Sequence, residues 1–195
     1  MKIGVWLFLL SLLGCQTSSK STEFLGLMLG EKMPKSGKKV EPPMLAMDLQ
    51  PYYEIEHPNM VFSHIGVAIT ENSDQLKSQG IQFRDEGIIY GAVFFNRDSN
   101  EECTKRNYDQ LVGSIKKKYD VVLVKEAGQK RDQLDKWTTY YSKNVIWSVI
   151  CSGKTFSVKI LDLGVLAKWS TVSGKDNPFL KSISEVEEMM KRRLD

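Results

Sequence analysis

Apolar and polar residues follow two periods along the chain, and a period of two predominates. Runs that are rich in β-branched and aromatic residues, bounded by Gly, Pro, Asn or Asp, predict short β-strands. The expected strands are 52–56, 60–70, 80–84, 88–96, 121–125, 134–141, 145–151 and 155–161, and 24–30 is expected to be a short strand or an extended entry to the first turn. Strands 80–84 and 88–96 flank Asp85-Glu86-Gly87, whose turn-forming residues predict a β-hairpin. Residues 35–51 contain Gly37, Pro42 and Pro43 and are expected to form a loop.

Three segments are expected to be helical instead. Apolar residues recur at helical spacing over 99–119, and Ser99 with Glu102 has the spacing of a capping box. A short helix is expected at 162–170, and a C-terminal helix at 182–194, where serine–glutamate pairs offer caps. The order of elements predicts the α+β class: a mainly antiparallel sheet packed against one long helix, with a C-terminal helix.

The first residues break both patterns. Lys2 precedes the continuous apolar stretch 3–13, which ends in Leu12-Leu13-Gly14-Cys15 and gives way to a Ser/Thr-rich run. The stretch is about half as long as the roughly 20 apolar residues of a membrane-spanning helix, so a permanent span is not expected. A buried N-terminal helix is the other alternative, but it would have no polar face. A positive start, a short apolar run and small residues are typical of an export signal.

Leu12-Leu13-Gly14-Cys15 in this position resembles the lipobox of bacterial lipoprotein signal peptides. The resemblance implies cleavage between Gly14 and Cys15 and lipid attachment at Cys15, through acyl chains such as palmitate. Each buried CH2 group contributes about 0.8 kcal/mol, so two or three chains would anchor the protein permanently. In that family an Asp after the lipidated cysteine favours the inner membrane, and Gln16 here implies the periplasmic side of the cell outer membrane. We therefore expect a signal peptide at 1–14, a lipidated flexible tether at 15–23, and a single α+β domain at 24–195.

The two other cysteines are Cys103 and Cys151. An exported chain in an oxidising compartment normally pairs two such thiols, so we predict a Cys103–Cys151 disulfide. Two independent buried thiols are the alternative. The segment 25–34 and the residues Glu102-Cys103 are similar to parts of small exported bacterial envelope proteins. That similarity implies one compact, disulfide-bearing domain and no site residues.

Charge and residue chemistry exclude several classes of function. The chain has 27 Lys and Arg against 24 Asp and Glu, a balance that does not favour nucleic acid as a partner. Its two histidines, His57 and His64, lack further ligands at zinc-binding spacing, and neither a GxSxG nor a P-loop motif is present. We expect no metal, no cofactor and no enzymatic activity. A catalytic site built from distant residues is the open alternative.

Two functions fit a lipid-anchored chain of this kind. The first is a non-catalytic protein-interaction module that binds another envelope protein, and the second is a lipid- or small-molecule-binding domain. Lys105, Arg106 and 116–118 form either a surface for anionic lipid or an ordinary solvated helix face. A second ambiguous group is aromatic and forms either a binding surface or cross-strand core pairs; its members are Trp137, Tyr140, Tyr141, Trp147 and Trp169.

Overall fold

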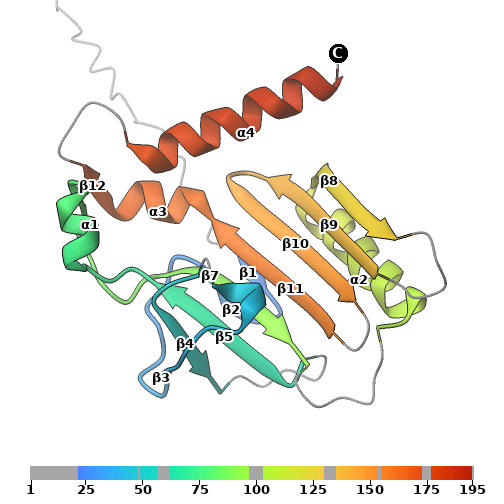
Figure 1. The fold of residues 1–195 in the computed structure, drawn as a ribbon, viewed down its shortest axis with the longest axis horizontal. Coiled ribbons are helices and arrows are strands. Elements are labelled where there is room, and N and C mark those ends of the chain that lie inside the picture. The colour runs from blue at the N-terminus through green and yellow to red at the C-terminus, as the bar shows by residue number, and fades with distance from the viewer. Residues whose placement is uncertain are drawn as a thin grey trace, which may run out of the picture.

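A large antiparallel sheet organises the protein (Figure 1). The computed structural model describes residues 22–47, 49–56, 62–96, 103–129, 135–152, 155–172 and 177–194. The sheet has eight strands in the order β3-β4-β5-β7-β11-β10-β9-β8. Their bounds are Lys38–Lys39 for β3, Tyr52–Ile55 for β4, His64–Ile69 for β5, Ile89–Phe95 for β7, Val122–Gln129 for β8, Asp135–Ser142 for β9, Val145–Ser152 for β10 and Thr155–Asp162 for β11.

Smaller elements surround this sheet. Two further strand pairs join β1 (Glu23–Phe24) to β2 (Leu27–Met28), and β6 (Ile81–Phe83) to β12 (Ser170–Val172). The helices are a 3-10 turn η1 (Met44–Ala46), α1 (Asp74–Ser78), α2 (Lys105–Tyr119), α3 (Leu163–Trp169) and α4 (Pro178–Leu194).

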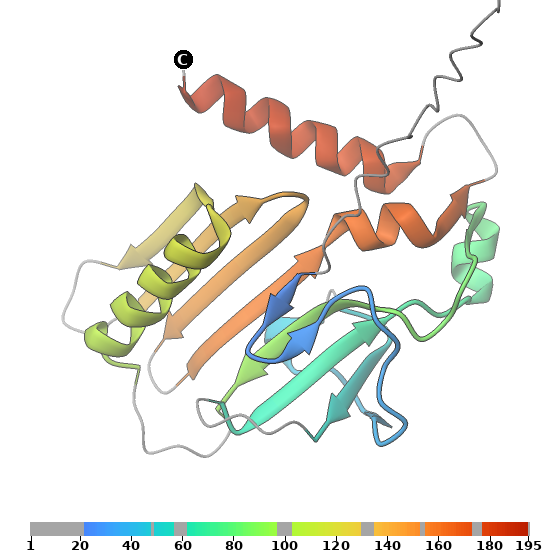
Figure 2. The same ribbon diagram turned by 180° about the vertical axis from the view of Figure 1, so that it is seen from behind.

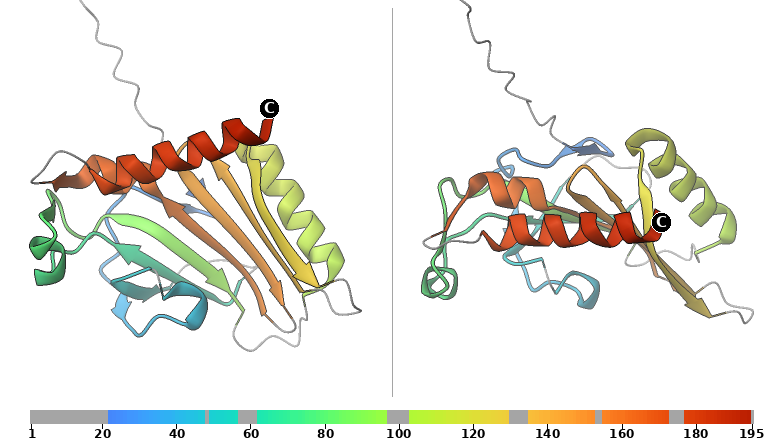
Figure 3. Two further views of the ribbon diagram at one scale, coloured as in Figure 1. Left: turned by 45° about the horizontal axis from the view of Figure 1, so that its top comes forward. Right: turned by 90° about the horizontal axis from the view of Figure 1, so that it is seen from above.

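The predicted α+β class with a mainly antiparallel sheet is confirmed, but the prediction of one long helix packed on the sheet is wrong. The α2 helix lies on one face of the sheet and covers only the part formed by β8–β10. The β1–β2 hairpin lies beside α2 on the same face (Figure 2). The α3 and α4 helices pack against each other, and α4 runs across the ends of the strands (Figure 3). One helix is insufficient because α2 buries only Tyr108, Val112 and Ile115, too narrow a stripe for eight strands.

The sheet separates two apolar clusters. On the α2 face, Phe24 of the hairpin packs edge-on against Phe94 at 5.0 Å and against Trp147 at 5.4 Å between ring centroids. On the opposite face, Val93 and Phe95 join residues of η1 and α3. Both faces of β7 are therefore buried, which explains why its sequence is continuously apolar rather than alternating.

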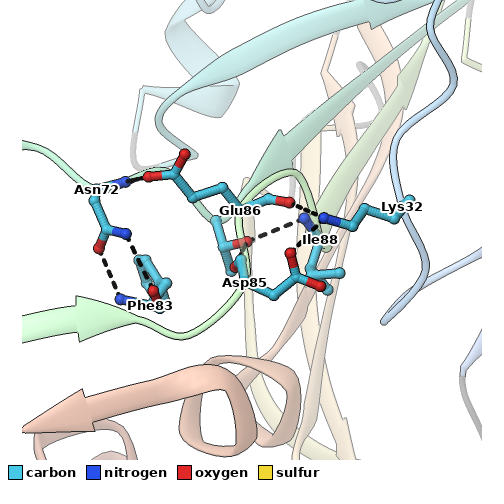
Figure 4. Close-up of polar contacts among 7 residues, drawn as sticks. Lys32, Asn72, Phe83, Asp85, Glu86 and Ile88 are labelled. Atoms are coloured by element: carbon cyan, nitrogen blue, oxygen red, sulfur yellow. Dashed lines mark hydrogen bonds and ion pairs between the residues drawn. The ribbon is translucent and has the colours of Figure 1, made fainter.

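The predicted hairpin between 80–84 and 88–96 is wrong, since β6 pairs with β12 whereas β7 pairs with β5 and β11. Figure 4 shows the contacts that separate the two strands. The side chain of Asn72 accepts a hydrogen bond from Phe83 N at 2.7 Å and donates one to Phe83 O at 3.1 Å. Thr70 Oγ1 donates to Asp85 O at 2.8 Å and accepts from Ile88 N at 3.0 Å. The side chains of Asn72 and Thr70 thus form hydrogen bonds with backbone groups that would take part in the pairing if β6 and β7 formed a hairpin.

Helix starts also differ from those expected. The α2 helix begins at Lys105, where Thr104 Oγ1 accepts from Asn107 N at 3.1 Å; the predicted cap residues Ser99 and Glu102 lie outside the described residues. The α4 helix begins four residues before Ser182, because Asn177 Oδ1 accepts from Phe179 N at 2.9 Å. Ser182 instead donates to Pro178 O inside the helix.

Most of the predicted strands are confirmed, with two changes. The segment 24–30 is a hairpin rather than a single strand or an extended entry, because Leu25 and Gly26 have φ angles of 50° and 85° and turn the chain back. The strand expected at 121–125 extends to Gln129, so β8 is a full edge strand. The short helix at 162–170 is present as α3, capped by Asp162, whose Oδ1 accepts from Val165 N at 3.0 Å.

Candidate functional site

Cys103 and Cys151 form the predicted disulfide pair. Their Cα atoms lie 5.5 Å apart, and 48 residues separate them in the chain. Cys103 directly precedes the capping residue of α2, whereas Cys151 lies in β10, so the pair fixes the start of the helix to the sheet. Cys15, the signal peptide 1–14 and the tether up to residue 21 lie outside the described residues.

No three His, Cys, Asp or Glu side chains among the described residues are placed to hold a metal ion. His64 Nδ1 lies 4.0 Å from Glu54 Oε1, and its ring stacks on Phe95 with 5.4 Å between centroids. His64 therefore packs between the side chains of the neighbouring strands β4 and β7. His57 lies outside the described residues.

The aromatic group singled out in the sequence is divided between core and surface. Tyr140, Tyr141 and Trp147 are buried, and burial raises the pKa of Tyr140 to about 12 because the ionised phenolate loses solvation. Trp169 is partly buried against the second cluster. Trp137 differs from all of these, since 51% of its surface is exposed. Burial thus excludes most of the group from a binding surface and leaves Trp137.

Trp137 lies on the face of β8–β10 opposite α2, and its side chain is exposed there. In register, Trp137 lies opposite Ala127 of β8 and Ile150 of β10, and directly opposed residues of antiparallel strands point to the same face. The α2 helix covers the other face of these strands. We define the front surface as five residues on the face of β8–β10 opposite α2: Val122, Ala127, Trp137, Thr139 and Ile150.

The front surface ends at an open strand edge. Its apolar members Val122 and Trp137 are 42% and 51% exposed, well above the core residues of the same strands. Strand β8 is outermost in the sheet, and within the described ranges no strand pairs with its outer side. An outermost strand beside exposed apolar side chains is a feature that protein partners use for strand addition.

A groove lies on the opposite face, between α2 and the β1–β2 turn. Its volume is about 510 Å³. The apolar lining comes from Phe24, Leu25, Leu111, Ile115, Tyr119 and Phe156. The polar lining comes from Asn96, Asn107, Gln110, Ser114 and Lys118. An apolar floor with polar groups at the rim is the general character of a site for an amphipathic ligand.

Comparison with protein-family models, with curated proteins and with solved structures finds no match. Among the described residues, no helix is both long and apolar enough to cross a membrane.

Sequence reasoning identified Trp137 but missed the residues that surround it. Val122 and Ala127 belong to β8, of which only the first part was expected as a strand. The signal that could have found them is the alternation in β9, where Trp137 and Thr139 share one face and the buried Thr138 and Tyr140 share the other. Phe24 and Phe156 of the groove were likewise expected only as strand residues.

Proposed function

We propose that this chain is a lipid-anchored envelope protein that acts as a non-catalytic protein-interaction module. The anchor is the lipobox cysteine, Cys15, and the module is the folded domain that follows it. A Cys103–Cys151 pair at disulfide distance suits an exported, oxidised protein and so supports the proposed location.

The observation that carries the interaction role is the exposed Trp137 on a sheet face beside an open edge. Tryptophan is enriched among the residues that dominate protein–protein binding, and burying its apolar surface supplies much of the free energy of association. A front surface that includes Val122 and Ile150 can receive a flat partner surface, and the β8 edge can receive an extended segment.

A lipid- or small-molecule-binding function is the second candidate, and the groove beside α2 favours it. Its volume of about 510 Å³ is within the range of ligand sites, and Phe24, Ile115 and Phe156 offer an apolar floor. The two candidates use opposite faces of the sheet, so variants can separate them.

Two experiments test the proposal. Cys15→Ser should move the protein out of the membrane fraction and abolish incorporation of labelled palmitate; unchanged acylation would contradict the anchor.

The interaction role is tested by chemical crosslinking of intact cells, followed by mass spectrometry to identify the proteins joined to the wild-type chain. A specific envelope protein should be recovered with wild type and lost with Trp137→Ala, whereas Leu111→Ala in the groove should retain it. Recovery of no protein partner would contradict the interaction role.

A further inference from the structure

The outer side of α2 carries an excess of positive charge. The helix contains five basic residues and one acidic residue, Asp109. Arg106, Gln110, Gly113 and Lys117 follow one another at helical spacing on the side opposite the buried stripe, and all four are exposed. Lys105 and Lys116 lie exposed on one flank of this row. The surface is therefore suited to an anionic partner.

The proposed anchor enters the domain next to this helix. The described chain begins at Thr22, and the following residue, Glu23, contacts the end of α2: Lys118 Nζ lies 2.6 Å from Glu23 Oε2, and Tyr119 donates to Glu23 O. The hairpin that starts here lies on the same face as α2 (Figures 2 and 3). From Cys15 to Thr22, a fully extended chain reaches at most about 25 Å, so this face stays close to the lipid surface.

We infer that the outer side of α2 lies against the membrane that holds the anchor and contacts anionic phospholipid headgroups through Arg106 and Lys117. The inference rests on the proposed lipid anchor at Cys15. Attraction between basic side chains and an anionic surface falls off within about a Debye length, roughly 8 Å at physiological ionic strength, and the short tether keeps the helix within reach. Each basic group near such a surface favours the bound orientation by roughly fivefold.

This orientation determines what the rest of the protein presents. Because α2 and Trp137 lie on opposite faces of the sheet, a membrane-facing α2 directs the front surface away from the lipid. The anchor and the basic helix then orient the domain together, and the β8 edge is accessible to a partner on the side of the domain that faces away from the membrane.

The test uses the full lipidated protein in phosphatidylcholine vesicles with or without phosphatidylglycerol. Lysines are labelled with an amine-reactive reagent and the extent of labelling is measured at each site by mass spectrometry. Labelling of Lys117 should fall severalfold when phosphatidylglycerol is present, and labelling of Lys125 on the front side of β8 should not change. High salt should restore labelling of Lys117, because screening weakens the attraction.

Variants and a flotation assay distinguish a failure of the proposed anchor from a failure of the proposed α2 orientation. In Arg106→Gln/Lys117→Gln, protection of Lys105 and Lys116 by phosphatidylglycerol should be lost, whereas the matched control Lys38→Gln/Lys125→Gln should retain it. Failure of the protein to float with either vesicle type would overturn the anchor and this inference together. Flotation with both types, but with Lys117 labelled equally in both or with Lys125 protected instead, would overturn the inference alone.

Discussion

Cys103, one residue before the cap of α2, is paired with Cys151 in β10, so the pair closes a loop of 48 residues across the sheet. A crosslink over a loop of this length restricts the unfolded chain and stabilises the folded state by about 4 kcal/mol in the chain-entropy model. Cys103→Ala/Cys151→Ala should lower the free energy of unfolding by about that amount, measured by urea denaturation. Reduced wild type should match the double variant; equal stability of oxidised wild type and the variant would contradict the pairing.

Asn72 replaces a neighbouring strand for part of β6. Asn72→Ala leaves Phe83 N and Phe83 O without these hydrogen bonds, and we expect a loss of about 3 kcal/mol in the free energy of unfolding. Asn72→Asp keeps the acceptor for Phe83 N and loses the donor, so its stability should lie between those of wild type and Asn72→Ala. If both variants unfold at the same urea concentration as wild type, the hydrogen bonds of Asn72 do not hold β6 in place.

The residue that caps the start of α4 is Asn177 in the structure, whereas the sequence predicted Ser182. Asn177→Ala should cost about 1 kcal/mol of stability, because the amide oxygen of Asn177 caps the helix. Ser182→Ala removes only a hydroxyl that donates to Pro178 O within the helix, and its effect should be smaller. Circular dichroism during urea unfolding measures both. A larger effect of Ser182→Ala would place the cap where the sequence predicted it.

Asp162 connects stability to pH. Burial raises the pKa of its carboxyl above the ordinary value of 3.8, against the opposing hydrogen bonds from Val165 N and Gly164 N. The folded state thus binds the proton more tightly than the unfolded state, and the stability of wild type relative to Asp162→Asn should be greatest below pH 3.8. It should fall as the pH rises through the raised pKa. Urea titrations of both proteins across this range check the sign; a stability of wild type relative to Asp162→Asn that rises with pH would contradict it.

Local sequence patterns were sufficient for elements that depend on local interactions. The strands at 134–141, 145–151 and 155–161 alternate or are continuously apolar, and they occur as β9, β10 and β11. The pairing of β6 with β12 was not predictable in this way, because it depends on Asn72 and on a strand about ninety residues away in the chain.

The exposure of Trp137 shows the same limit at the candidate site. Trp137 and Trp147 both occupy strands rich in aromatic residues, yet Trp147 is 1% exposed. The difference arises because Trp147 lies on the face that α2 and Phe24 cover, whereas Trp137 lies on the other face. The sequence predicts which residues share a face of a strand, but not which face a distant helix covers.

The most direct test of the account is a comparison of photo-crosslinking from the two faces in intact cells. A photoreactive amino acid is placed at Trp137 on the front surface, or at Gly113 on α2, where a side chain would meet nothing within 4 Å. We predict that position 137 forms a covalent adduct with another envelope protein and that position 113 does not. Protein adducts from position 113 alone, or from neither position, would contradict the claim that the front surface binds a protein partner.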